Sequence, residues 1–493
     1  MSSFKVFHVA PEQPTNLADR TSIPLTGSDL DSELIANSIT IPCPFDTDRL
    51  RASLAKTLQI FPLHCGTLAR EVTGNAWGIK LTNRPVRLVM GVTDNPGPFS
   101  DQWMGETHPD YYEEIDRDSI FSERDTPLFL AKVTTWRETG QTALFVCIWH
   151  GLGDGFAALH FIKTWSALYQ GKPPVGDPTF GNFFLPAPEI LSISCYTYEL
   201  SRLSYLSLAF EPEFCDRRNK LIKQQTVRLD IDVPESFVDK IWASVRRENP
   251  VNNVHVGRGD AFSGYLIAAL QGCFEKPVET LFQFVSTRGR SAIYNGQNLY
   301  FPRSSQGNAF VLWSTPITTA RNEQTPGTLA QTLFRGRNSL ADRDRLGRAL
   351  MLTNYLWSRA FAENKRIIDS GFQDAIIINW LVGVETNKAN FGFPLQSSYI
   401  DWASTEKFVQ VWNANPMKQT DGTWRRDPGG LHILLRLQPR HATKFLEKLR
   451  QDMDRLSIEQ SYPSSPTSLI RRLQDVESHG LVVESRSTEK AML

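Results

Sequence analysis

The feature that most constrains the fold is an almost wholly apolar run, Thr142–Trp149, which ends at a histidine and a glycine-rich turn. A continuous apolar run of this length predicts a strand that is covered on both faces. The turn His150–Gly155 reads His-Gly-Leu-Gly-Asp-Gly, and helical spacing of apolar residues follows as far as Tyr169. The sequence therefore predicts a buried strand, a tight turn and a helix, with His150 at the end of the strand.

Two side chains of this turn are candidates for a chemical role. A histidine on the rigid end of a strand can project into a cleft, where its neutral imidazole can act as a general base. Asp154 stands where the helix begins, so it can cap the helix or pair with a distant arginine. A core histidine followed by a capping aspartate fits equally well. A metal site is disfavoured, because the nearby His160 is carried away by the helix.

Strands and helices alternate in both halves of the chain, which predicts a mixed α/β (α+β) fold. Hydrophobic periodicity and capping residues predict the individual elements. The predicted strands are 35–41, 128–135, 142–149, 280–286, 375–384 and 431–437, and the predicted helices are 46–60, 155–169, one after Asp260, and 439–456.

The expected domain organisation has two domains and a crossover. The chain has 493 residues, enough for two or three domains. A stretch rich in Pro and Gly, 171–188, predicts the exit from an N-terminal domain, 1–188. Residues 189–225 lack a clear period and are predicted to form a long crossover linker. The C-terminal domain is 226–493, part of which is expected to complete the first sheet, and its tail after Ser457 is expected to be loose beyond residue 485.

Composition argues against several classes of protein. Lys plus Arg number 53 and Asp plus Glu number 53, so the net charge gives no argument for nucleic acid or an anionic membrane. The N-terminus lacks the apolar core of a signal peptide, and no apolar stretch is long enough to span a bilayer. The six cysteines form no CxxC pair, which predicts buried, reduced thiols. A cytoplasmic protein without a metal, nucleic-acid or membrane partner is expected.

Other catalytic schemes lack their motifs. The chain has no Gly-x-Ser-x-Gly elbow and no Walker loop, and Gly257–Gly259 is too short for a dinucleotide fingerprint. Cys147 lies inside the apolar strand and is predicted to be a packing residue rather than a nucleophile.

The segment His150–Gly155 resembles the HxxxDG signature of the BAHD acyltransferases of plants and fungi. Further segments agree in the right order along nearly the full chain, and together they are far more specific than any one alone. Phe61–Leu68 is similar to "yPlaGRl", Asp260–Phe262 to "tDalsA", Val285–Arg290 to "vDgRxR", Gln306–Asn308 to "fGN", and Asn379–Trp380 with Asn390–Pro394 to "SW…DFGWG".

The departures from the family pattern are informative. In the last motif, Asn390, Phe393 and Pro394 replace Asp, Trp and Gly, and Ser286 replaces the usual Asp before the two arginines. The last motif is chiefly structural in the family, so its changes bear little on catalysis. Such drift is typical of a divergent, fungal-type member.

The resemblance implies a fold, a reaction and a set of site residues. The fold would be two chloramphenicol-acetyltransferase-like domains, each a mixed sheet flanked by helices, with the active site in a channel between them. The donor would be an acyl-CoA, acetyl-CoA by default, and the acceptor a hydroxyl of a small specialised metabolite. No metal would take part, and the enzyme would be a monomer.

The resemblance also assigns roles to residues. His150 would be the general base of a ternary-complex mechanism, and the indole N–H of Trp380 would bind the oxyanion. Asp154, with Gly155 beside it, would hold the shape of the loop by pairing with an arginine of the Arg288–Arg290 stretch. Ile378 stands where the family often has a threonine, so oxyanion support is expected to be thinner. No coenzyme A contact is assigned.

Three alternatives stay open. An N-acyltransferase of the same family would take an amine. A condensation domain of a peptide synthetase shares the fold, but its signature has two adjacent histidines, and here Trp149 precedes His150. A catalytically inactive binding relative is a third alternative, and the intact His150 with both flanking glycines argues against it.

Overall fold

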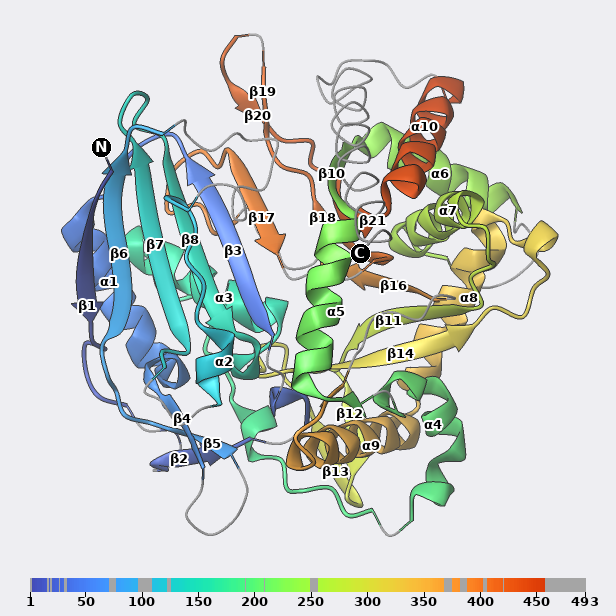
Figure 1. Cartoon of the computed structure of the whole chain (residues 1–493), viewed down its shortest axis with the longest axis horizontal. Helices are drawn as coiled ribbons and strands as arrows, with labels where there is room; N and C mark the ends of the chain where they lie inside the picture. The colour runs from blue at the N-terminus through green and yellow to red at the C-terminus, as the bar shows by residue number, and fades with distance from the viewer. Residues whose placement is uncertain are drawn as a thin grey trace, which may run out of the picture.

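The computed structural model of the protein describes residues 2–456 except 16, 18, 19, 26, 31, 32, 71–76, 96–108, 122–125, 191, 208, 249–255, 368–374, 382–387, 402–405 and 420. Two six-stranded sheets form its framework, one in each half of the view in Figure 1. The predicted tail after Ser457 lies outside the described residues.

The first sheet is antiparallel except where β6 and β7 run parallel. Its central strands are buried because helices and other strands cover them, so their sequences are apolar without alternation. In spatial order the strands are β1 (Ser3–Val9), β6 (Val86–Thr93), β7 (Phe129–Trp136), β8 (Thr142–Trp149), β3 (Leu34–Ile41) and β17 (Ser397–Asp401).

The second sheet is mixed, because β16 runs parallel to both of its neighbours. Its strands, in spatial order, are β10 (Val227–Val233), β21 (Leu431–Leu437), β18 (Phe408–Asn413), β16 (Ala375–Trp380), β11 (Thr280–Ser286) and β14 (Phe310–Pro316). The smaller sheets are β2 (Ser22–Pro24) with β5 (Trp77–Lys80) and β4 (Thr67–Arg70), β12 (Ser291–Tyr294) with β13 (Gln297–Tyr300), β15 (Arg366–Ile367) with β9 (Ala209–Phe210), and β19 (Met417–Lys418) with β20 (Trp424–Arg425).

Helices flank the sheets. One large apolar cluster surrounds the first sheet and extends onto one face of the second through residues such as Phe282, Val311 and Ile377, and another covers the opposite face of the second sheet. The helices are α1 (Thr47–Ile60), α2 (Arg117–Ile120), α3 (Gly155–Tyr169), α4 (Thr197–Arg202), α5 (Pro212–Gln225), α6 (Glu235–Glu248), α7 (Arg258–Cys273), α8 (Pro326–Asn338), α9 (Arg343–Ala362) and α10 (Pro439–Arg455). The mixed α/β class that the alternating pattern predicted is confirmed. No helix in the described part of the chain combines the length and apolar character needed to cross a membrane.

Most predicted elements occur close to their predicted bounds. The strands at 142–149, 280–286 and 431–437 and the helix at 155–169 coincide with β8, β11, β21 and α3. Asp46 caps α1 by accepting from the Arg49 N–H at 2.9 Å, as its position before the helix predicted. The strand predicted at 375–384 ends at Trp380, and 382–384 lie outside the described residues.

The crossover contains more regular structure than its sequence suggested. Residues 189–225 include α4 and α5, and α5 stands between the two sheets in Figure 1. Of the residues of α5, Cys215 alone is buried. A helix that buries so little needs no apolar stripe, which is why its sequence shows no clear period.

The first sheet takes a strand from the far end of the chain. Ser397 pairs with Thr40, and Asp401 with Ala36, so β17 lies antiparallel to β3. The domain bounds 1–188 and 226–493 stay a proposal, and this pairing shows that the later segment contributes to the earlier sheet.

Candidate active site

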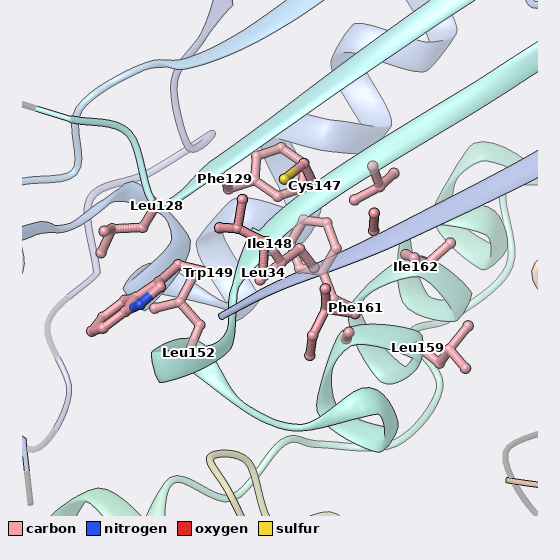
Figure 2. Close-up of a cluster of buried hydrophobic side chains, with 14 of the residues drawn as sticks. Leu34, Leu128, Phe129, Cys147, Ile148, Trp149, Leu152, Leu159, Phe161 and Ile162 are labelled. Atoms are coloured by element: carbon pink, nitrogen blue, oxygen red, sulfur yellow. The ribbon is translucent and has the colours of Figure 1, made fainter. Parts of the chain in front are cut away.

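Strand β8 carries His150 to the end of the first sheet on rigid backbone. Every residue of β8 is buried between β3 and β7, and Figure 2 shows Phe161 and Ile162 of α3 beside it. The N–H of His150 donates to the Glu33 carbonyl at 2.9 Å, which continues the pairing with β3 beyond the strand. A side chain on such a support keeps a fixed direction, as a catalytic group requires.

Cys147 is a packing residue, as its place inside the strand predicted. It lies among the apolar side chains of β7, β8 and α3 in Figure 2. Burial raises the pKa of its thiol to about 12, and a neutral thiol is a poor nucleophile. The prediction that the cysteines are buried is wrong for Cys43, which is half-buried, and for Cys195, which is exposed.

The turn after His150 depends on Gly153, whose φ is +150°. A Cβ added there would lie 2.5 Å from the Ala157 Cβ and 3.2 Å from the Gly307 nitrogen. Gly153 and Gly307 form an isolated parallel bridge. The turn after His150 therefore packs directly on the segment that precedes β14, and glycine allows the two backbones to approach this closely.

Asp154 is fully engaged by structural partners. Its Oδ1 accepts from the N–H groups of Phe156 and Ala157, both at 3.1 Å, and so caps α3. The Arg288 guanidinium donates to both carboxylate oxygens, at 2.7 and 2.9 Å, and the Ala309 N–H donates to Oδ2 at 3.2 Å. This arrangement suits a structural role better than proton transfer. Gly155, the next residue, begins α3 and is buried.

The two arginines of the Arg288–Arg290 stretch have different partners. Arg288 also donates to the carbonyls of Ser305 and Gly307, at 3.0 and 3.3 Å, and lies over the Phe156 ring. Arg290 donates instead to the Leu340 carbonyl at 3.4 Å, and burial, with the charge of Arg337, lowers its pKa. The structure thus brings Arg288, and not Arg290, to Asp154.

A residue that sequence reasoning missed connects this turn to a third segment. The Asn308 side-chain N–H₂ donates to the His150 carbonyl at 3.1 Å and to Asp29 Oδ1 at 3.2 Å. The Asn308 backbone N–H also donates to Asp29 Oδ1, at 3.2 Å. Asp29 lies on the 3₁₀ turn η1 (Gly27–Leu30). The "fGN" resemblance pointed to Asn308, whereas no motif pointed to Asp29.

Asp29 is a buried carboxyl group in an unusual electrostatic setting. Burial raises the pKa of Asp29 to about 7. The hydrogen bonds from Asn308 act in the opposite direction and lower this pKa, and the negative charge of the nearby Asp154 raises it further. The turn that carries it is seated on α9 through Gly27, whose φ is +57°. A Cβ at Gly27 would lie 2.0 Å from the Asn354 Oδ1, so a larger residue would push Asp29 out of place.

The His150 ring has an aromatic neighbourhood. Its ring centroid lies 6.5 Å from that of Phe310, and Phe284 follows at 5.1 Å from Phe310. His150 is 5% exposed, whereas Phe310 and Phe284 are half-buried on the second sheet. Aromatic rings next to a general base can line a path for an apolar substrate.

Trp380, the expected oxyanion donor, ends β16 in the second sheet and is half-buried. Its indole lies close to Gly259 at the start of α7, where an added Cβ would be 3.2 Å from the ring. Ile378, at the position where the family often has a threonine, is buried in the apolar cluster of the second sheet. The role of Trp380 stays a proposal.

The segment Asn390–Pro394 packs far along α3 from the turn. The Phe391 ring contacts Trp165 and Tyr169, with centroids at 5.5 and 5.7 Å. The Phe391 N–H donates to Ser166 Oγ at 2.7 Å. These contacts fix the C-terminal part of α3 and include no titratable catalytic group, which suits a structural motif. No group of three or more potential metal ligands occurs within the described residues.

The two sheets, their helices and the crossover form the chloramphenicol-acetyltransferase-like fold that the resemblance implied. The solved structure of vinorine synthase has a TM-score of 0.63 at 15% identity, over 91% of this chain and 98% of that one. The structure of F. sporotrichioides TRI101 complexed with coenzyme A and T-2 has a TM-score of 0.57 at 16% identity, over 88% and 97%. At such identity these likenesses concern the fold.

Sequence comparison finds similarity to one family over part of the chain. The model of the Transferase family matches residues 39–190, which include the His150–Gly155 turn. Rosmarinate synthase of Plectranthus scutellarioides is 34% identical over 150 residues, which are 29% of this chain and 32% of that protein. The match thus spans about a third of that relative. The matched part of the chain is thus similar to the Transferase family, and the identity to its relatives is low.

Proposed function

We propose that the protein transfers an acyl group from coenzyme A, acetyl by default, to a hydroxyl group of a small specialised metabolite, with His150 as general base. The observation that supports this most is the fixation of His150: it ends a buried strand, its carbonyl is bound by Asn308, and its turn is clamped by Asp154 and Arg288. Such rigidity suits a residue that must meet two substrates in one geometry.

The proposed reaction proceeds without an acyl-enzyme. The imidazole takes the proton of the acceptor O–H while the oxygen attacks the thioester carbonyl, which forms a tetrahedral oxyanion. The indole N–H of Trp380 donates to this oxyanion. The C–S bond then breaks, and the proton on His150 passes to the departing thiolate. The products are an ester and free coenzyme A.

The burial of Asp154 and Arg288 supports a structural role for this pair and a catalytic role for His150 alone. The exposed fraction of each side chain is below a tenth, at 8% and 7%. Both Asp154 oxygens already accept hydrogen bonds from Arg288 and from backbone N–H groups, so they hold the loop and leave proton transfer to His150. Gly155 and Arg290 belong to the same supporting shell in this proposal.

Thiol release from a panel of acyl-CoAs with simple alcohols tests the function. His150→Ala should lower turnover by about 10²–10⁴ and leave folding intact, because the backbone contacts of His150 remain. His8→Ala is the matched control, since His8 is exposed on β1. Wild-type turnover in His150→Ala would contradict the general-base role.

The same assay separates the alternatives. Turnover with amines but not alcohols would favour N-acylation, and turnover with a carrier-protein thioester alone would favour a condensation domain. Absence of thiol release with every acceptor would favour an inactive binding relative. The proposal also includes a monomeric, cytoplasmic enzyme without a metal, which size-exclusion chromatography, localisation and a chelator test address.

A further inference from the structure

A small pocket beside the catalytic turn has a polar lining that no part of the proposed chemistry uses. Its cavity volume is about 20 Å³, which is enough for one group the size of a water molecule or an ammonium. Asn308 and Phe310 line it, and they are the residues that contact His150 through its carbonyl and its ring. The pocket therefore lies beside His150 and has room for the charged end of a small substituent.

Three buried polar side chains line this pocket with unused hydrogen-bonding capacity. Both hydrogen bonds to Asp29 end at Oδ1, so its Oδ2 accepts none from the described residues. The hydroxyls of Thr287 and Thr353, whose residues are 1% and 4% exposed, have no hydrogen-bond partner there either. Buried polar groups are rarely left in this state, because each costs free energy until a ligand or water satisfies it.

The charges of the lining residues indicate which kind of ligand the pocket can bind. Asp29 is the one ionisable residue that lines the pocket, and no Lys, Arg or His lines it within the described residues. The nearest guanidinium of the turn, that of Arg288, is already bound to Asp154. Burying a carboxylate without a counter-ion costs free energy, and a cation that also donates N–H hydrogen bonds offsets most of this cost.

The aromatic residues of the lining also favour a cation with N–H donors. Phe301 and Phe310 line this space. Aromatic faces attract an ammonium group, and a phosphate or carboxylate would meet Asp29 as a like charge. The Thr353 and Thr287 hydroxyl oxygens can accept further N–H bonds from an ammonium.

We propose that this pocket binds a protonated amine substituent of the acceptor, with Asp29 as its counter-ion and Thr287 and Thr353 as further hydrogen-bond partners. The acceptor would then be an amino alcohol in the broad sense: its hydroxyl meets His150, and its basic nitrogen enters the pocket. This inference rests on the proposed acyl transfer for its catalytic meaning, but binding of the amine can be measured without turnover.

Thiol release with acetyl-CoA tests the inference directly. Amino alcohols are compared with diols of the same chain length, so that the cation is the variable. The wild type should show a KM for the amino alcohol about tenfold or more below that for the diol, since a charge-assisted bond is much stronger than a neutral one. Asp29→Asn should erase this preference by raising KM for the amino alcohol relative to that for the diol, whatever its common effect on kcat through Asn308.

Two controls separate recognition from structure. Asp48→Asn removes a carboxylate from the exposed start of α1, where its side chain is 92% exposed, and should keep the preference. If Asp29→Asn does not fold, Thr353→Val keeps the shape of the pocket and should still raise KM for the amino alcohol only. Equal KM values in the wild type, or a KM ratio of the two acceptors that Asp29→Asn leaves unchanged, would overturn the proposal.

A binding measurement distinguishes failure of this inference from failure of the proposed function. Butylammonium and butanol are titrated into the wild type and Asp29→Asn by NMR. Ammonium binding that requires Asp29 supports the pocket even if no acyl transfer is found. Thiol release from simple alcohols, with no preferential ammonium binding, would keep the function and refute the pocket.

Discussion

The guanidinium of Arg288 holds both carboxylate oxygens of Asp154, at 2.7 and 2.9 Å. The two residues are distant in sequence, and their contact joins the start of α3, beside the first sheet, to the end of β11 in the second. One ion pair therefore fixes the catalytic turn and the relative position of the two sheets at that turn.

We expect Asp154→Ala to lower the free energy of unfolding by about 3–5 kcal/mol, because it leaves Arg288 buried without its counter-ion. Urea unfolding followed by circular dichroism measures this change. Asp48→Ala is the control, since its exposed pair with Arg51 is worth less than about 1 kcal/mol. A loss in Asp154→Ala as small as that in the control would show that the pair is not structurally important.

Gly153→Ala should destabilise the turn by about 1–3 kcal/mol, because the new Cβ meets Ala157 at 2.5 Å and the φ of +150° is unfavourable. The matched change is Gly272→Ala in α7, where no heavy atom lies within 4 Å of the added Cβ. That variant should be neutral or slightly stabilised. Melting temperatures compare the two, and equal values would contradict the proposed close approach of the turn to Gly307.

Asn308→Ala should impair turnover more than stability. It removes the donor to the His150 carbonyl and lets the turn shift, and a small misplacement of a catalytic group can cost about 10² in rate. Loss of the hydrogen bonds should cost about 1–3 kcal/mol of stability. Thiol-release kinetics and urea unfolding give the two values, with Asn298→Ala on the exposed part of β13 as control. A normal kcat in folded Asn308→Ala would rule out this positioning role.

His432 predicts a pH dependence of stability. Burial opposes its charged form, but Asp232 and Asp230, at 2.7 and 3.2 Å from its ring nitrogens, outweigh burial and raise its pKa. A raised histidine pKa contributes stability that is complete below the unfolded pKa of about 6.5 and is lost as the pH rises through the folded pKa.

The difference in unfolding free energy between the wild type and His432→Gln should therefore be largest near pH 5 and should narrow toward pH 9, which lie about 1.5 units below and about 2.5 units above the unfolded pKa of about 6.5. Urea unfolding at a series of pH values measures it. For His8→Ala, on the exposed strand β1, the difference should stay small and constant. A difference for His432→Gln that does not change with pH would mean that the imidazole is neutral throughout.

Those parts of the structure that depend on residues adjacent in the sequence could be predicted from it. Strand β8 and helix α3 were predictable because the apolar run and the cap at Asp154 are local signals, and the site residue His150 follows from their junction. That an arginine of Arg288–Arg290 would reach Asp154 came from the family resemblance. Which of the two does so depends on the turn at Gly289, whose φ is +76°, and on tertiary packing.

Contacts between distant segments leave no comparable signal. Asp29 and Asn308 are separated by 279 positions, so no spacing indicates that they meet beside His150. The helix α5 was missed for a different reason, since Cys215 alone is buried there. Exposed positions tolerate many residues, so such a helix need not show a periodic sequence.

The pairing of β17 with β3 has a consequence for synthesis in the cell. Thr40 leaves the ribosome long before Ser397, its partner across the sheet. Until then the nascent first sheet presents an open edge at β3, and open strand edges promote association with other chains. Folding of the first sheet therefore cannot be completed until β17 has been translated. The chain would depend on chaperones or on slow translation more than a chain whose two halves fold independently.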